Sequence, residues 1–368
     1  MRLLGVIILK ALEFGWFSPT SGDTTAFGVD EANIDITPEY LQGVADAAEQ
    51  AGFEYMLIPV DQRCWEAYIA GAFMAARSQT IAPLIAARPG YINPVLLAKM
   101  ISTFDRFSGG RICVNLIAGQ AEAEIVAEGI RYTKEDRYAL MTEEVSILKA
   151  LWTADGPLDW DGRFHQLRGA VINPRPLQQP YPKFYLGGGS QEAWQLSAEH
   201  SDVHLFWGDA PERIESNISE IRALAAEFGR GDEIQFGMRL QIICRDTQAE
   251  ALAAAEALVA NVPEAARELL KQDTHNSQAN QRVQQIVDER GLWIDDHLWS
   301  GLTRFRRGAG IAVVGDPHQC AATLQRFIDA GCSSFCLSGY LHHEEARRFG
   351  HLVRPLLVQN NPGRMQAA

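Results

Sequence analysis

Short apolar stretches, of a length typical of buried strands, alternate with longer amphipathic stretches along most of the chain. Helix-start signals introduce several of the amphipathic stretches, among them Thr37-Pro38 and Asn93-Pro94, where a capping side chain precedes proline. The pattern predicts strands at residues 12–18, 53–59, 80–87, 111–117, 183–186, 203–206, 235–244 and 334–337. It predicts helices at residues 38–51, 65–76, 93–107, 121–128, 134–152, 191–200, 211–228, 248–261, 317–330 and 343–357.

This order of strands and helices indicates an α/β fold. Two alternations of four units would suit a doubly wound sheet, but eight units over 368 residues favour the (β/α)8 or TIM barrel. The functional side chains of such a barrel follow its strands, at their carboxyl ends. Two insertions are predicted: a small hairpin around Asp161-Gly162, and a mobile lid at about 262–310, before the last β/α unit. The lid segment is polar and ends in Arg-Phe-Arg-Arg-Gly-Ala-Gly, which suits closure over an anion.

We therefore expect one barrel domain over residues 12–358 and a flexible tail at 359–368. Residues 1–11 carry a charge and a short apolar run, as a secretion signal does, but no small-residue cleavage site leads into a flexible spacer. We interpret them as an extra N-terminal segment. No stretch approaches the roughly 20 apolar residues of a membrane helix.

Composition narrows the choice of partner and compartment. The net charge of −13 disfavours nucleic acid or an anionic membrane as the main partner, so an anionic substrate would need a local basic pocket. The six cysteines lack zinc-ribbon spacing, and no metal site is expected. Cysteines in apolar, strand-like runs are typical of buried thiols in a reducing compartment, which indicates a cytoplasmic protein.

Residues 173–190 carry the strongest local motif. A proline-rich arm leads into a short apolar strand, which ends in Gly187-Gly188-Gly189-Ser190 before a predicted helix. Glycines allow close approach of a ligand, and a helix start offers free N–H groups to an anion, as at the phosphate of a nucleotide-like cofactor. A tight strand-to-helix turn without a ligand is the alternative, because a single glycine cluster is a weak signal.

Several short stretches, taken together and in order, resemble the bacterial-luciferase-like, reduced-flavin-dependent monooxygenases. Within that family the resemblance is closest to the alkanesulfonate monooxygenases, and it extends from about Phe14 to Leu357. The matching stretches are residues 17–23, 63–67, 103–111, 115–117, 207–208, 236–240, 306–310 and 337–340.

The resemblance implies a barrel that binds FMN as FMNH2 and uses O2 as co-substrate. By position, Asn115 and Glu124 would lie by the flavin. The residues implied near its phosphate are Arg137, Tyr138, Gly189 and Ser190, in agreement with the glycine motif. For Arg137 and Tyr138 the alternative is a cap on the surface of a long helix.

The resemblance also implies a sulfonate pocket that contains Trp207, Arg239, Arg306 and Tyr340. A guanidinium presents a fixed fork of donors to an oxyanion, while tryptophan and tyrosine each add a donor and a wall. The alternatives are a buried structural ion pair for Arg239 and a solvated lid charge for Arg306.

Two further catalytic candidates come from the resemblance. Cys64 matches a cysteine near the flavin, where a packing role is favoured over direct catalysis. His342 would orient Tyr340 or carry a proton, and its alternative is a helix-start residue that faces solvent.

Two positions depart from the alkanesulfonate pattern. Ser21 and Gln241 stand where that pattern has histidines, so an acid–base step assigned to those histidines must move elsewhere. Both are neutral hydrogen-bonding side chains and suit a hydroxylated substrate. A polyhydroxylated sulfonate, such as the sulfosugar sulfoquinovose, therefore joins the alkyl sulfonates as a candidate.

The function expected from these residues is FMNH2-dependent cleavage of the C–S bond of an organosulfonate, which releases sulfite and a carbonyl product. A separate NAD(P)H-dependent flavin reductase would supply FMNH2, since no Gly-x-Gly-x-x-Gly fingerprint follows the early strands. A homodimer or homotetramer is expected. Three alternatives remain: oxygenation of a pyrimidine or amine, a flavin-binding protein without turnover, and a deazaflavin-dependent dehydrogenase.

Overall fold

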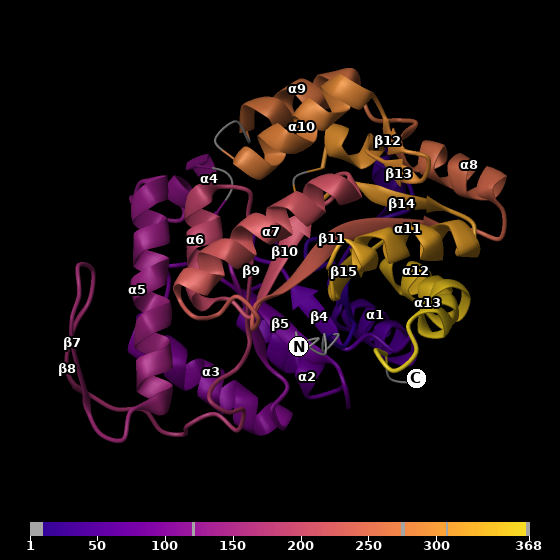
Figure 1. Cartoon of the computed structure of the whole chain (residues 1–368). Coiled ribbons are helices and arrows are strands. Elements are labelled where there is room, and N and C mark those ends of the chain that lie inside the picture. Colours follow the sequence, from indigo (N-terminus) through magenta and orange to yellow (C-terminus); the bar gives the residue numbers. More distant parts are fainter. Residues whose placement is uncertain (1–9, 120–121, 274–276, 307, 366–368) are drawn as a thin grey trace, which may run out of the picture.

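The chain folds around a closed barrel of eight parallel strands, shown in the computed structural model of Figure 1. The structure describes residues 10–365 except 120–121, 274–276 and 307. Around the barrel the order is β10, β9, β6, β5, β4, β1, β15 and β11, and β11 pairs with β10 to close it. The strands are β1 (Glu13–Phe17), β4 (Tyr55–Ile58), β5 (Ala82–Ala87), β6 (Cys113–Leu116), β9 (Phe184–Gly187), β10 (Val203–Trp207), β11 (Gln235–Cys244) and β15 (Ser334–Ser338). Each lies on a predicted strand, so the TIM barrel is confirmed.

Helices cover the outside of the barrel (Figure 1). They are α1 (Pro38–Gln50), α2 (Ala67–Ala75), α3 (Pro94–Ser108), α4 (Glu122–Ala127), α5 (Lys134–Thr153), α6 (Gln191–His200), α7 (Pro211–Glu227), α8 (Gln248–Val259), α11 (Pro317–Asp329), α12 (His342–Arg348) and α13 (Arg354–Asn360). A π-helical turn at Phe349–Val353 joins the last two, which together form the helix predicted at 343–357. The predicted start of α4 at Ala121 lies outside the described residues.

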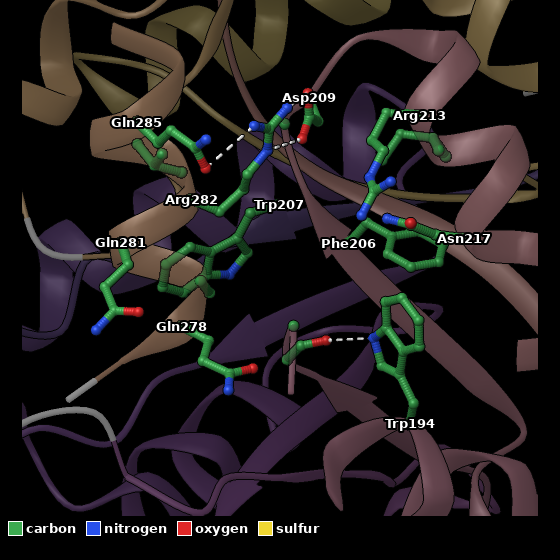
Figure 2. A pocket seen from close by; sticks show the side chains of 16 residues that line it. Trp194, Phe206, Trp207, Asp209, Arg213, Asn217, Gln278, Gln281, Arg282 and Gln285 are labelled. Carbon is green, nitrogen blue, oxygen red and sulfur yellow. Dashed lines mark hydrogen bonds and ion pairs between the residues drawn. The ribbon is translucent and has the colours of Figure 1, made fainter. Parts of the chain in front are cut away.

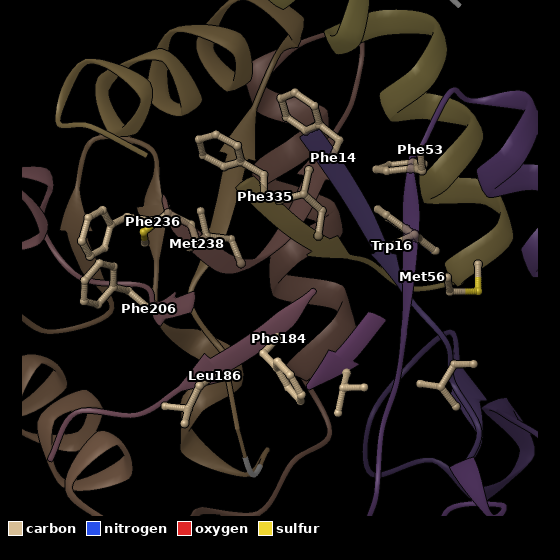
Figure 3. Close-up of a cluster of buried hydrophobic side chains, with 14 of the residues drawn as sticks. Phe14, Trp16, Phe53, Met56, Phe184, Leu186, Phe206, Phe236, Met238 and Phe335 are labelled. Carbon is tan, nitrogen blue, oxygen red and sulfur yellow. The ribbon is translucent and has the colours of Figure 1, made fainter. Parts of the chain in front are cut away.

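The strands are buried on both faces, which explains their nearly continuous apolar sequences. In β4, Tyr55 and Leu57 belong to the cluster inside the barrel, whereas Met56 and Ile58 pack between the barrel and its helices. Figure 3 shows part of this outer layer, in which Phe14 stacks on Phe335 with ring centroids 5.2 Å apart. The barrel is therefore a packed core, and binding space lies beyond its strand ends.

Additional strands extend the barrel sheet. The second half of β11 pairs with β14 (Ala312–Gly315), which pairs with a hairpin of β12 (Trp293–Asp295) and β13 (Leu298–Trp299). The predicted hairpin is present as β7 (Leu158–Asp161) and β8 (Gln166–Ala170). A third small pair, β2 (Asp23–Thr24) with β3 (Asn33–Ile34), follows β1. No described helix is long and apolar enough to span a lipid bilayer.

The segment interpreted as a lid is folded in its described part. It contains α9 (Glu264–Asp273), α10 (Gln278–Arg290), the β12–β13 hairpin and a 3-10 turn at Gly301–Arg304. Its mobility remains a prediction. Of the two terminal segments, residues 1–9 and 366–368 lie outside the described residues. Arg364 donates from Nε to the carbonyl of Lys10, and the amide of Leu12 donates to the carbonyl of Arg364.

A buried carboxyl under the β7–β8 hairpin gives a pH-dependent stability prediction. Burial, with the nearby charge of Glu143, raises the pKa of Glu144 to about 7, although the Gly90 amide donates to both its oxygens. The native state therefore holds this proton more tightly than the unfolded chain, and stability is lost as pH rises from about 4.5 to about 7. Glu144→Gln should match wild type at pH 5 and exceed it by up to about 3 kcal/mol at pH 8.

Urea unfolding at the two pH values measures this difference. Exposed Glu135→Gln, in the first turn of α5, is the control and should show no pH-dependent gain. A Glu144→Gln protein that is destabilised equally at both pH values would contradict the prediction.

Candidate active site

Two arginines lie over one aromatic ring at the mouth of the barrel. The guanidinium carbons of Arg239 and Arg306 are 4.6 Å and 5.8 Å from the centroid of Phe17, the last residue of β1. Arg239 comes from β11, where it pairs in register with Trp207 of β10 and Cys336 of β15. Arg306 comes from the far end of the insertion. Strand register and the inserted segment thus bring together three of the predicted substrate residues.

Arg239 is buried without a carboxylate partner. Its side chain donates to the carbonyl oxygens of Leu240 and Cys336, and no Asp or Glu of the described residues lies within ion-pair distance of it. Burial, with the charge of Arg306, lowers the pKa of Arg239 to about 10, so the group still carries its charge at neutral pH. The interpretation of Arg239 as half of a structural ion pair is therefore wrong. A buried guanidinium that has no carboxylate partner among the described residues favours an anionic ligand.

Arg306 is held in place by contacts to Tyr340 and to the loop that follows Arg306 in sequence. Its Nε donates to the Tyr340 hydroxyl over 2.8 Å, and its Nη1 donates to the carbonyl of Ala309 over 2.8 Å. The Tyr340 oxygen accepts this bond, so its own O–H can be donated to a ligand. The side chain of Arg306 is thus ordered against the barrel mouth and is not a solvated lid charge.

Gln241 lies on the same strand as Arg239 and is fully buried. Its amide oxygen accepts from Ser338 over 2.7 Å, and its Nε2 donates to the carbonyl of Ala309 over 3.1 Å. These contacts connect β11, β15 and the loop that carries Arg306. A direct contact between Gln241 and substrate remains a prediction, and so does one for Ser21, which is exposed in the loop after β1.

The structure favours a packing role for Cys64. Its thiol lies against the hydroxyls of Thr20 and Ser21, and burial raises its pKa. A raised thiol pKa disfavours the thiolate, which is the nucleophilic form.

His342 is buried at the start of α12, between the rings of Tyr340 and Phe17. Its Nδ1 lies 2.9 Å from the Oδ2 atom of Asp23, in the loop region after β1. The alternative of a solvent-facing residue is wrong for His342, since its side chain is 2% exposed.

The predicted phosphate residues divide into two groups. Gly188, Gly189 and Ser190 end β9 and begin α6, where the Ser190 hydroxyl accepts from the amide of Ala193. The hydroxyl of Tyr138 lies beside Gly188 and interacts with Ser190. Gly188 has φ of +156°, and a Cβ there would meet the Cβ of Ala193 at 2.7 Å, so this turn requires glycine.

Arg137 belongs to the other group. It is buried and paired with Glu122 at 3.1 Å, and it donates to the carbonyls of Ala118 and Tyr132. A phosphate would have to compete with Glu122 for this guanidinium. In this structure Arg137 connects α5 to the segment on either side of α4, and its role in phosphate binding remains a prediction.

Asn115 and Glu124 lie at the carboxyl end of the β5–β6 part of the barrel. Asn115 is buried on β6, opposite Ala86 and Tyr185. Glu124 forms a buried ion pair with Arg88, which follows β5 and also pairs with Glu128. Arg88 was not predicted, although its place directly after a strand is the expected one for a functional residue.

One cavity of about 460 Å³ joins the glycine loop to Trp207 (Figure 2). It lies between the carboxyl ends of β9 and β10, the first turns of α6 and α7, and helix α10 of the insertion. Its lining includes Gly188, Gly189, Trp194, Phe206, Trp207, Arg213, Asn217, Gln278 and Arg282. Asp209, just after β10, pairs with Arg282 at 2.8 Å and ties α10 to the barrel. Neither partner was predicted, because the pattern of a polar insertion does not show which residues meet the barrel.

The sequence of the chain establishes its family. A model of the luciferase-like monooxygenases matches residues 12–334, and the chain belongs to this family. The family match names no substrate, and the alkanesulfonate resemblance therefore enters only the proposal below.

Solved structures share the fold at low identity. They include the riboflavin lyase RcaE with modified FMN and riboflavin (18% identity, 95% of this chain and 92% of that chain, TM-score 0.80). EDTA monooxygenase EmoA from Chelativorans sp. BNC1 matches at 17% identity, with 96% and 94% covered and a TM-score of 0.78. DmoA from Hyphomicrobium sulfonivorans matches at 17% identity, with 98% and 90% covered and a TM-score of 0.79.

Proposed function

We propose that this protein is an FMNH2-dependent monooxygenase that cleaves the C–S bond of an organosulfonate. The observation that carries the proposal is the buried, charged Arg239, which has no carboxylate partner in the described part of the chain and lies beside Arg306, itself bonded to the Tyr340 hydroxyl. Together these three side chains carry enough donors for the three oxygens of a sulfonate. A neutral ring such as a pyrimidine has no need of two guanidiniums.

The residues around the glycine loop fit a flavin phosphate. Ser190 and Tyr138 offer hydroxyls, and the start of α6 offers backbone N–H groups in a turn that only glycine permits. Bound reduced FMN, with O2, supplies one oxygen atom and two electrons to the reaction. The partner that reduces it would be a separate NAD(P)H-dependent flavin reductase, and the expected assembly is a cytoplasmic homodimer or homotetramer.

The balanced reaction defines what the protein must do. A sulfonate R–CH2–SO3⁻ with FMNH2 and O2 gives R–CHO, SO3²⁻, FMN, H2O and one proton. Arg239 and Arg306 hold the sulfonate, Tyr340 donates its hydroxyl to it, and Trp207 forms a wall. His342, whose ring centroid lies 5.1 Å from that of Tyr340, would take the proton that the carbon loses. Helix α10 lines the adjoining cavity, where a bound flavin and substrate would have to be kept from water.

A sulfite-release screen tests the proposal. Alkyl, aryl and sugar sulfonates are each supplied with FMNH2 and O2, beside carboxylate analogues of the same carbon skeleton. Sulfite is expected from at least one sulfonate, with a polyhydroxylated one favoured by the neutral side chains of Ser21 and Gln241. Oxidation of the carboxylates without sulfite from any sulfonate would instead assign the arginine pair to another anion.

Cofactor binding gives a separate prediction. Wild type should bind oxidised FMN at least tenfold more tightly than riboflavin. Ser190→Ala should weaken FMN by about 1–2 kcal/mol, because it removes a hydrogen bond to a charged group, and should leave riboflavin nearly unchanged. Ser190→Thr keeps both the hydroxyl and the helix cap and serves as the matched control. Flavin fluorescence titration measures both ligands, and equal affinities in wild type would show that this loop holds no phosphate.

A further inference from the structure

Asp23 is a buried carboxylate with an unusually full set of contacts. Its Oδ1 accepts from the amide of Thr24 over 2.8 Å. Its Oδ2 accepts from the Tyr40 hydroxyl over 2.6 Å and from the backbone amide of His342 over 2.8 Å, and it lies 2.9 Å from Nδ1 of the same histidine. These contacts join the loop after β1, helix α1 and the start of α12.

The imidazole ring of His342 has the Asp23 carboxylate beside one nitrogen and no partner within the described chain at the other. Nδ1 lies within ion-pair distance of the Asp23 carboxylate, although the contact does not have hydrogen-bond geometry in this structure. The opposite ring nitrogen, Nε2, is buried and has no hydrogen-bond partner among the described residues. A buried, unpaired ring nitrogen costs free energy unless a ligand uses it.

The groups around His342 place its ring beside residues of the proposed substrate site. The rings of Phe17 and Tyr340 lie 6.0 Å and 5.1 Å from its ring, and Trp16 lies edge-on at 6.4 Å. Phe17 carries both arginines on its face, and Tyr340 holds Arg306.

The other charged or titratable groups lie on the far side of the carboxylate. His343 contacts the Tyr40 hydroxyl at 3.3 Å, and Glu344 acts on Tyr40 at longer range. Among the described residues, Asp23 is the carboxylate within ion-pair distance of Nδ1.

We propose that Asp23 is a positioning residue that holds His342 with its proton on Nδ1, so that Nε2 faces the substrate as a proton acceptor. The proposal rests on the proposed function, in which the reacting carbon loses one proton. That proton moves to Nε2, and the Asp23 carboxylate, which stays ionised, stabilises the resulting imidazolium. The arrangement replaces the acid–base role of the histidines that Ser21 and Gln241 displaced. The interaction of Asp23 with His342 and Tyr40, against the effect of burial, lowers the pKa of Asp23, which agrees with a permanent anion.

Asp23 would make the same contacts if its role were purely structural. The test therefore needs measurements that a loss of stability alone would not change. The variants are Asp23→Asn, Tyr40→Phe, which removes one bond to Asp23 but keeps its charge, and exposed Asp35→Asn as control. The first readout is the 15N spectrum of the histidine side chains in the resting protein, with His342 assigned by loss of its signals in His342→Gln. The second is the pH profile of kcat/KM for sulfite release.

In wild type and in Asp35→Asn, the His342 spectrum should show the Nδ1–H tautomer, and in Asp23→Asn a mixture of both. Asp23→Asn should lower kcat by at least about 100-fold with little change in KM, as expected when the orienting carboxylate of a histidine base is neutralised. The pH profile of kcat/KM should also differ in shape between Asp23→Asn and wild type. Tyr40→Phe, which keeps the charge of Asp23, should change kcat less than tenfold.

The spectrum separates this proposal from the sulfonate assignment, because it needs no substrate. An unchanged His342 tautomer in folded Asp23→Asn would overturn the positioning role. If Asp23→Asn lowered both the activity and the melting temperature but left the pH profile of kcat/KM unchanged, the positioning role would also be overturned. A changed tautomer with no sulfite from any sulfonate supports the Asp23–His342 coupling and refutes the proposed function.

Discussion

Arg239→Met should abolish most sulfite release and yet leave the protein at least as stable as wild type. The expected loss in kcat/KM is about 100- to 10,000-fold, the range for removing one partner of a buried, charged contact. The stability result follows from the missing carboxylate: in the described chain no ion pair is broken, and an uncompensated buried charge disappears. Burial lowers the pKa of Arg239 to about 10, which puts the cost of that charge on the order of 3 kcal/mol.

Two measurements check this prediction together. Sulfite release with FMNH2 and O2 reports the loss of function, and urea unfolding without ligands reports stability. FMN binding should be unchanged, because Ser190 and Tyr138 belong to other elements. A variant that unfolds more easily than wild type would mean that Arg239 has a structural partner and is not reserved for an anion.

Arg306→Ala and Tyr340→Phe should each lower kcat/KM by about 10- to 1,000-fold, a loss of 1.4–4 kcal/mol of transition-state binding. Their effects should not add. The Tyr340 hydroxyl accepts from Arg306 Nε, so each side chain orients the other toward the sulfonate. The double variant should therefore be little worse than Arg306→Ala alone.

A nearby arginine of the insertion provides the control for this comparison of the single and double variants. Arg304 pairs with Glu264 at the surface, and Arg304→Ala should retain activity within a factor of three, since surface ion pairs contribute little. Additive losses at Arg306 and Tyr340 would show that the two residues act separately, and the shared anion site would then be wrong.

The fold could be predicted from the sequence because its main signal is local. Strands such as β4 and β11 are apolar runs, and helices such as α1 begin with a capping residue and proline. The short strands added to the sheet beside β11 were not predicted. The four residues of β14 and the two of β13 are stabilised by pairing with β11 and with each other, which a local pattern does not reveal.

The site could be predicted in part. Resemblance placed Arg239, Arg306 and Tyr340, and the structure brings them together over Phe17. The partners of these residues depend on contacts between distant segments. Asp23 and His342 are 319 positions apart in sequence, and they become neighbours because β1 pairs with β15 and α1 packs against α12.

The same limit explains Arg137. The residue type suits a phosphate, but the side chain that it contacts, Glu122, lies on a different helix. Helices α9 and α10 were likewise not predicted from the sequence, since they are mostly polar and few of their side chains enter the core. The sequence thus indicated candidate site residues, but only the packing shows which of them, like Arg137, already have a partner within the protein.

The most direct test of the central claim is the yield of sulfite in a single turnover. The protein is loaded with FMNH2 without oxygen and mixed with O2 and a saturating sulfonate, with sulfoquinovose and an alkyl sulfonate as the two substrates. For at least one of them we expect close to one sulfite per FMNH2 oxidised, and almost none from Arg239→Met. Complete oxidation of FMNH2 to FMN and hydrogen peroxide, with no more sulfite from wild type than from Arg239→Met on either substrate, would contradict the account.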